Sequence, residues 1–125
     1  MERRRYKRVS GRLKIVYKAV GEKDEGSVYS MDVSAGGFCL GLDRVFKADT
    51  VLELLVYLPD KEKPFLCLGK VAWQKPNAVK ASDGKIYFMT GLRFENLDLK
   101  NRLRLIYYVH GRAQAEPEIE KETKG

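Results

Sequence analysis

The chain has 125 residues, of which 44% are hydrophobic and 33% charged, so it carries enough apolar surface for one folded core. Lys and Arg outnumber Asp and Glu by 24 to 17, and the net charge of +7 favours anionic partners such as phosphates, nucleic acids or acidic membrane surfaces. No apolar run approaches the roughly 18 residues of a membrane-spanning helix, and the arginine-rich start lacks the apolar region of a secretory signal. We therefore expect a cytoplasmic protein without membrane insertion.

The first eight residues, MERRRYKR, carry five positive charges. Such a run is usually a solvated tail or a nucleic-acid contact, and we expect residues 1–10 to form a flexible basic arm. The spacing of the arginines indicates a more specific role, which is the binding of an anion. Arg4 and Arg8 are four residues apart, so a turn would bring both guanidinium groups onto one anion, and each offers the planar pair of donors that suits phosphate.

Three strands are predicted next, at residues 12–18, 27–34 and 38–42, with a break at residues 35–37. In the first two, apolar residues alternate with polar ones, which is the pattern of a half-buried strand. The residues expected to point inward are Leu13, Ile15, Tyr17, Tyr29, Met31 and Val33.

Three longer strands are predicted at residues 50–60, 64–75 and 85–95, which are rich in β-branched and aromatic residues. A short charged turn joins the first two, and a polar connection precedes the third. Six antiparallel strands with short loops predict a small all-β fold, a closed six-stranded antiparallel barrel, because closure removes exposed strand edges. An open sandwich is the alternative.

The apolar period then changes, and one helix is predicted over residues 98–111 to close the domain of residues 11–112. Asp98 is the expected N-cap and Gly111 the expected C-terminal stop. Residues 113–125 are polar, and we expect a disordered tail. The face expected to pack on the barrel comprises Leu99, Leu103, Ile106 and His110.

The sequence offers little to a catalytic mechanism. His110 is the single histidine and lies on the predicted apolar face, so we interpret it as a packing or edge residue rather than a general base. Asp32 and Ser34 share a strand face, but a serine beside a carboxylate without an imidazole is not activated. Cys39 and Cys67 lie far apart, which predicts neither a metal site nor a disulfide framework. We expect no enzyme, catalytic residue, metal or cofactor.

The segment from Asp32 to Gly37, DVSAGG, complements the arginines. Its carboxylate can accept hydrogen bonds from the N1–H and N2–H₂ groups of guanine, while arginine donates to N7 and O6. Glycine lets a backbone approach a flat ligand without a Cβ atom in the way. The two segments together could hold the base and phosphate of a guanine nucleotide.

At these residues the chain resembles the PilZ domains, bacterial receptors for the second messenger cyclic di-GMP. One family signature is R-x-x-x-R, often after another arginine, and it matches Arg4 to Arg8 with Arg3 before it. The other, D/N-x-S-x-x-G, matches Asp32 to Gly37. The later segments GKVAW and TGLRF and the closing helix extend the resemblance to about residue 111. Lys7 stands where many members have proline.

The resemblance implies a six-stranded antiparallel barrel of the split-barrel type that binds cyclic di-GMP through both segments. Arg4 and Arg8 would bind phosphate and guanine, Arg3 would contact a second ligand molecule, and Arg5 and Lys7 would be solvated. The residues that would line the base pocket are Asp32, Ser34, Gly36 and Gly37. Ligand would clamp the arm over the barrel and alter a surface read by a separate partner protein, in control of motility, exopolysaccharide production or biofilm formation.

Two other functions stay open at this point. A basic barrel can bind nucleic acid, which would give a steep salt dependence spread over many lysines, although we expect no DNA partner. A PilZ-like adaptor could instead bind only protein and not the nucleotide. The sequence leaves the oligomeric state as a monomer or a homodimer.

Overall fold

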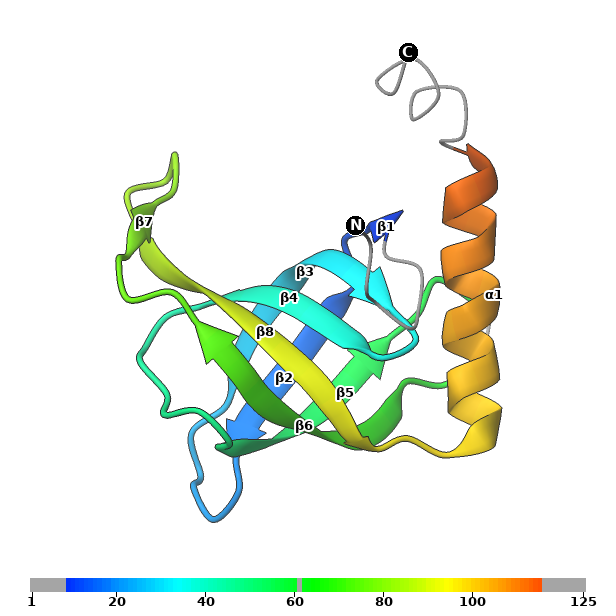
Figure 1. The fold of residues 1–125 in the computed structure, drawn as a ribbon, viewed down its shortest axis with the longest axis horizontal. Helices are drawn as coiled ribbons and strands as arrows, with labels where there is room; N and C mark the ends of the chain where they lie inside the picture. Colours follow the sequence, from blue (N-terminus) through cyan, green and yellow to red (C-terminus); the bar gives the residue numbers. More distant parts are fainter. Residues whose placement is uncertain (1–8, 61, 116–125) are drawn as a thin grey trace.

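The structure, a computed structural model, describes residues 9–60 and 62–115, which form eight strands and one helix (Figure 1). The elements are β1 (Val9–Ser10), β2 (Lys14–Ala19), β3 (Gly26–Ser34), β4 (Gly37–Leu42), β5 (Val51–Tyr57), β6 (Phe65–Gln74), β7 (Val79–Lys80), β8 (Ile86–Asn96) and α1 (Leu99–Ala115).

Six of the strands form a closed antiparallel barrel. They follow one another around the ring in the order β3, β2, β5, β6, β8 and β4, and pairing between β4 and β3 completes it (Figure 1). Closure gives each of the six strands a neighbour on both sides, so the barrel stabilises itself without a covering layer. The predicted six-stranded barrel with one C-terminal helix is confirmed, and the open sandwich is wrong.

The two remaining strands were not predicted. β1 pairs with the end of β3 and belongs to the segment expected to be a flexible arm. β7 pairs with the start of β8 and lies in the expected polar connection. Each has only two residues, which is too short to show the alternation by which a strand is recognised in a sequence.

The barrel core follows directly from that alternation. Every second residue of β2 and β5 points inward, and these side chains are almost completely buried: Ile15, Tyr17, Leu52, Leu54 and Val56. Each large apolar side chain removed from water contributes about 1.5–3 kcal/mol. Tyr17 keeps its polar end satisfied because its hydroxyl donates a hydrogen bond to Asp43 at 2.7 Å, and burial together with that carboxylate raises the Tyr17 pKa.

Three register shifts interrupt the pairing of the barrel strands, and two of them are β-bulges that each turn a side chain outward. The pairing of β3 with β4 shifts between Ser30 and Asp32, so Ser30 is buried whereas Asp32 lies on the outer surface. The pairing of β6 with β8 shifts between Val71 and Trp73, so Val71 is buried whereas Trp73 is 42% exposed. In an unbroken strand, residues two apart would share a face.

The first bulge overturns one prediction for β3. Tyr29 does not point into the barrel but is exposed, with the guanidinium of Arg12 4.9 Å from its ring centroid. Ser30 takes the inward position instead. Its hydroxyl accepts a hydrogen bond from the Leu13 N–H at 2.9 Å and donates one to the carbonyl of Gly11, so this buried polar group is paired.

The start of α1 is as predicted, but its end is not. Asp98 accepts a hydrogen bond from the Asn101 N–H at 3.0 Å, which confirms the N-cap. The helix continues through Gly111 to Ala115. Glycine ends a helix by adopting a positive φ, and Gly111 is not among the residues that do so.

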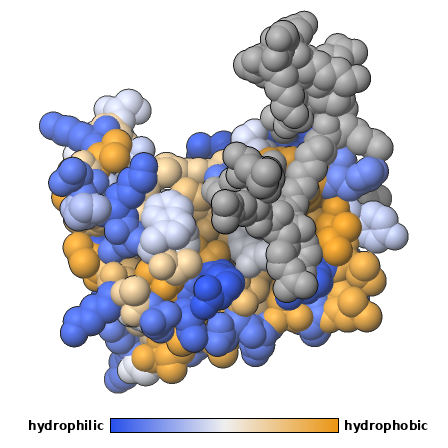
Figure 2. Space-filling view, viewed as in Figure 1, coloured by the Kyte–Doolittle hydropathy of each residue, from blue (hydrophilic) through white to orange (hydrophobic). Residues whose placement is uncertain are grey.

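The face by which α1 packs also differs from the prediction. The residues facing the barrel are Leu105 and Val109, and both are buried. The residues expected to pack, Leu99, Leu103, Ile106 and His110, are exposed instead. Hydrophobic side chains therefore line the outward edge of α1 in Figure 2. In the described part of the chain, no helix is both long enough and apolar enough to cross a membrane.

A second contact orients α1 on the barrel. Arg104 donates hydrogen bonds to both carboxylate oxygens of Asp60, at 3.1 and 2.9 Å, and to the carbonyl of Lys63 at 2.9 Å. These bonds lower the pKa of Asp60. A bidentate pair of this kind restricts rotation of the helix about its own axis.

We expect the two thiols to be unreactive in the folded protein. Cys39 and Cys67 are buried, and burial raises the pKa of Cys67 to about 12, so its reactive thiolate is scarce at neutral pH. An aromatic disulfide reagent at pH 8 should label both residues in denaturant and neither in its absence. Stoichiometric labelling of the native protein within minutes would contradict the barrel packing around them.

Candidate functional site

The turn between β3 and β4 is held by one serine. The Ser34 hydroxyl accepts hydrogen bonds from the N–H groups of Gly36 and Gly37, at 3.1 and 3.2 Å. A serine that bonds to the backbone two and three residues later stabilises a tight turn. Ser34, predicted to line the base pocket, does border the pocket described below, but its hydroxyl is engaged in shaping the turn.

Gly37 is required by the packing of the strands rather than by an approaching ligand. A Cβ atom at this position would lie 1.9 Å from the carbonyl oxygen of Leu92 on β8. β4 and β8 can therefore come together here only because residue 37 has no side chain. Gly36 contributes through its backbone, since its carbonyl accepts a hydrogen bond from the Phe94 N–H at 3.0 Å.

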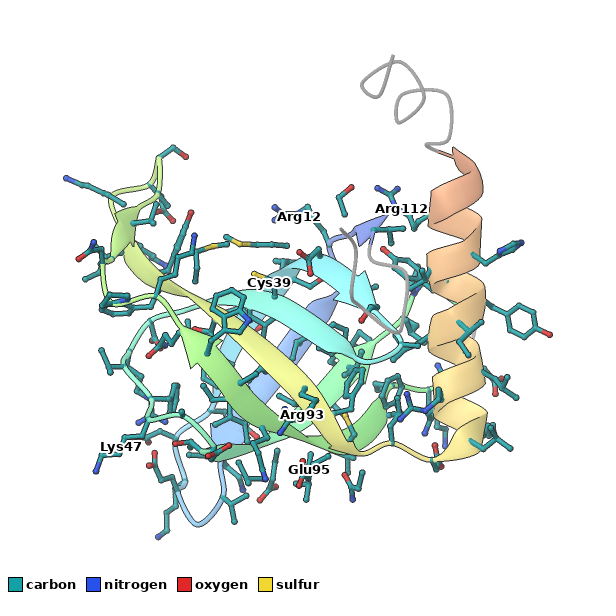
Figure 3. The ribbon with its side chains drawn as sticks, viewed as in Figure 1. Arg12, Cys39, Lys47, Arg93, Glu95 and Arg112 are labelled. Carbon is teal, nitrogen blue, oxygen red and sulfur yellow. The ribbon has the colours of Figure 1, made fainter. Side chains whose placement is uncertain are left out.

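The turn borders a shallow pocket of about 160 Å³ on the outside of the barrel. All four described residues of the predicted site line it: Asp32, Ser34, Gly36 and Gly37. Trp73 and Arg93, which were not predicted, complete it, and Figure 3 shows Arg93 on β8. Pockets that enclose a whole small ligand measure about 300–1,000 Å³. The described residues thus form an open part of a site with a carboxylate, an aromatic ring and a guanidinium.

Trp73 stands at the surface because of two separate features. The bulge in β6 turns it outward, and Gly91 on the neighbouring β8 leaves the space for its ring. A Cβ atom on Gly91 would lie 2.3 Å from the indole nitrogen of Trp73. The indole therefore lies against bare backbone, and a planar ligand in the pocket would find an aromatic surface beside it.

The predicted arginines, Arg3, Arg4 and Arg8, lie outside the described residues. The chain that follows them is placed next to the pocket. Val9 pairs with Val33 and Ser10 with Asp32, as β1 runs antiparallel to the end of β3.

Arg102 connects the turn to the helix. Its guanidinium donates a hydrogen bond to the carbonyl of Ala35 at 2.7 Å, across 67 residues of sequence. Ala35 lies between Ser34 and Gly36, so α1 is tied to the middle of the turn that borders the pocket. No sequence pattern announces such a bond between a side chain and a distant carbonyl.

A larger hollow lies elsewhere, between the β7–β8 hairpin, β3 and α1 (Figure 1). It measures about 1150 Å³, its lining includes Arg12, Tyr29, Tyr87 and Tyr108, and it contains none of the four described residues of the predicted site. Within residues 9–60 and 62–115, no three His, Cys, Asp or Glu side chains are grouped as a metal ion would require.

Comparison with known proteins agrees with this architecture. A family model, described as the PilZ domain, matches residues 2–111 of the chain. No curated protein sequence matches it.

Solved structures share the fold at low sequence identity. The PilZ domain with c-di-GMP of YcgR from Escherichia coli is 15% identical with a TM-score of 0.69, over 96% of this chain and 99% of that one. The Bacillus subtilis inhibitor of motility, MotI/DgrA, is 19% identical with a TM-score of 0.69, over 93% of this chain and 54% of that one. The MrkH–c-di-GMP complex from K. pneumonia is 15% identical with a TM-score of 0.67, over 100% and 57%. The chain thus spans little more than half of MotI and MrkH.

Proposed function

The chain belongs to the PilZ domain family, and from this we propose that it is a receptor for cyclic di-GMP that acts on a separate partner protein rather than an enzyme. The observation that carries the proposal is the pair of β-bulges. They present Asp32 and Trp73 to one pocket beside the turn that Ser34 holds. Two of the similar structures, YcgR and MrkH, are described with c-di-GMP.

Each group of the pocket suits one part of the ligand. The Asp32 carboxylate accepts from the N1–H and N2–H₂ edge of guanine, and the Trp73 indole offers a surface on which a base can stack. The Arg93 guanidinium supplies donors for a phosphate. We propose that Arg4 and Arg8 complete the phosphate site from the segment before β1, and that Arg3 contacts a second ligand molecule.

The proposed mechanism is a change of surface. Cyclic di-GMP held between the Arg4–Arg8 segment and the pocket fixes that segment over the barrel, and a partner protein reads the new surface. A ligand shifts such an equilibrium only by its difference in affinity for the two positions of the segment. We propose that this occurs in the cytoplasm, where buried thiols such as Cys67 stay reduced, and that the partner belongs to motility, exopolysaccharide or biofilm control.

Calorimetric titration with cyclic di-GMP tests the proposal. We expect the wild type to bind at tens of micromolar or tighter, and Arg4→Ala, Arg8→Ala and Asp32→Ala each to weaken binding roughly 10- to 150-fold, the loss of one charge-assisted hydrogen bond. Trp73→Leu should weaken it roughly 5- to 150-fold through lost stacking. Because Trp73 is the single tryptophan, ligand should also change the intrinsic fluorescence of the wild type.

Arg5→Ala is the matched control, because it removes one charge from the same segment at a position expected to be solvated. It should bind like the wild type. If the wild type does not bind cyclic di-GMP, the chain is better explained as an adaptor that binds only protein. If Arg5→Ala weakens binding as much as Arg4→Ala and Arg8→Ala do, the arginines act through their total charge and not as a specific site. A parallel titration with a random oligonucleotide distinguishes the receptor from a nucleic-acid-binding protein. A nucleic-acid-binding protein should bind the oligonucleotide, and Asp32→Ala should not weaken that binding.

A further inference from the structure

One peptide group of the β3–β4 turn is held at both of its ends. This group, called here the turn peptide, joins Ala35 to Gly36, and because a peptide group is planar its carbonyl and its N–H turn together. The Arg102 guanidinium donates a hydrogen bond to its carbonyl at 2.7 Å. The Ser34 hydroxyl accepts one from its N–H at 3.1 Å. Arg102 on α1 and Ser34 on β3 therefore fix the same group from opposite sides.

The turn peptide has a second orientation that the sequence permits. Residues 34–37 form a β-turn, since Ser34 pairs with Gly37 and residues 35 and 36 connect the two strands. The middle peptide group of a β-turn can turn over when the third residue is glycine, because that residue then takes a positive φ. Gly36 is the third residue, and it is not among the residues with a positive φ. The structure thus shows one of two forms that this turn can adopt.

Turning over would change the border of the pocket. Ser34 and Gly36 both line it. In the turned-over form the Ala35 carbonyl oxygen would take the place of the Gly36 N–H and would face the Ser34 hydroxyl. An N–H group can donate to an anionic ligand, whereas a carbonyl oxygen only accepts hydrogen bonds and repels an anion. The observed form is therefore the one that suits a ligand with phosphate groups.

α1 is a firm support for Arg102, because other residues fasten the helix. Leu105 and Val109 are buried against the barrel. Arg104 donates hydrogen bonds to both carboxylate oxygens of Asp60. Figure 1 shows α1 beside the part of the barrel where β3 ends and β4 begins. Arg102 is half-buried, and because its bond to the turn has a charged donor, it favours the observed form more strongly than a neutral bond would.

We propose that Arg102 is a positioning residue for the binding of cyclic di-GMP, a role that rests on the function proposed above for the pocket. Arg102 acts through the turn peptide, since its guanidinium keeps the Gly36 N–H and the Ser34 hydroxyl in the arrangement that borders the pocket. A protein with a smaller population of its binding-competent form has a proportionally higher apparent Kd. Loss of the Arg102 guanidinium should therefore weaken binding, although Arg102 does not line the pocket itself.

Calorimetric titration with cyclic di-GMP measures this effect in Arg102→Met. Methionine keeps a long unbranched side chain on the helix but has no N–H group to donate. We expect the Kd to rise roughly 2- to 30-fold, since the loss of one charge-assisted hydrogen bond shifts the balance between the two forms of the turn. Lys100→Met is the matched control, because it removes the same charge from α1 at a side chain that is 76% exposed and lies 4.0 Å from Glu62. It should bind like the wild type.

Gly36→Ala separates this role from a general effect of α1 on the barrel. Alanine rarely adopts a positive φ, so Gly36→Ala disfavours the turned-over form whether or not Arg102 is present. Whatever Gly36→Ala itself does to binding, the addition of Arg102→Met to it should change the Kd by less than about twofold. A residue that only stabilised the fold would weaken binding by the same factor in both backgrounds. Circular dichroism checks that each variant is folded.

Hydrogen exchange of the residue 36 amide, followed by NMR without ligand and corrected for the intrinsic rate of each residue, reports on the turn peptide directly. This N–H is bonded to Ser34 in the observed form, so Arg102→Met should speed its exchange, and the further change Gly36→Ala should slow it again. An unchanged exchange rate or Kd in Arg102→Met, or equal weakening by Lys100→Met, would overturn the role of Arg102 alone. A wild type that does not bind cyclic di-GMP would overturn the proposed function and this role with it.

Discussion

Gly37→Ala is expected to lower the free energy of unfolding by about 3 kcal/mol or more. The new Cβ atom would lie 1.9 Å from the Leu92 carbonyl oxygen and 3.1 Å from the Cα atom of Arg93. Both neighbours belong to the backbone of a barrel strand, so relief requires β4 and β8 to separate and their hydrogen bonds to break. The midpoint of urea unfolding, followed by circular dichroism, measures the loss.

Gly111→Ala is the matched control for this substitution. A Cβ atom at residue 111 has nothing within 4 Å, and the residue lies inside α1, where alanine stabilises a helix by up to about 1 kcal/mol relative to glycine. We expect an unchanged or slightly higher midpoint. If both variants unfold at the same urea concentration, the close approach of β4 and β8 at Gly37 is not a feature of the molecule.

Leu54→Ala is expected to destabilise the barrel by about 2–5 kcal/mol, because Leu54 is fully buried between β5 and its neighbours. Its effect should depend on Gly69 of β6. A Cβ atom on Gly69 would lie 2.8 Å from the Leu54 Cδ1 atom, so Gly69→Ala alone overpacks the core by about 1–3 kcal/mol. With Leu54 shortened, that Cβ atom fills the space left behind.

The double variant tests this coupling. Its loss of stability should be smaller than the sum of the two single losses by about 0.5–3 kcal/mol. Denaturant unfolding of the wild type, the two single variants and the double variant gives the four stabilities of this double-mutant cycle. Simple additivity would mean that the Leu54 side chain and the missing Cβ of Gly69 do not share one space.

Much of the fold could be predicted because local and global signals agree. The strict alternation in β2 and β5 specifies which side of each strand is buried, and Asp98 marks the start of α1. The four described residues of the predicted site between Asp32 and Gly37 line one pocket because they lie in one short segment, and their role in binding a ligand stays a prediction.

The bulges explain what could not be predicted about the site. A bulge adds one residue to a strand without changing its composition, so the sequence around Met31 and Ala72 is that of an ordinary strand. The inserted residue reverses the side of every later side chain. The regular alternation of side chains along a strand therefore predicted that Tyr29 points into the barrel, and it gave no reason to place Trp73 at the pocket.

The prediction of which side of α1 packs on the barrel was wrong for a different reason. The helix has two apolar bands, and the exposed one, which comprises Leu99, Leu103, Ile106 and His110, is the longer, so periodicity alone assigns it to the core. The band that is buried consists of Leu105 and Val109, and it is fixed by contacts from residues distant in sequence, such as Asp60 with Arg104. A hydrophobic period states that a side is apolar, not what it packs against.

The contact between Trp73 and Gly91 also bears on how this surface can evolve. The indole occupies the volume that a side chain at residue 91 would need. Two positions on neighbouring strands are therefore coupled, because any side chain acquired at residue 91 displaces the large ring at residue 73. Loss of the glycine is consequently a one-step route by which a descendant of this protein would abandon the aromatic wall of its pocket while keeping the barrel.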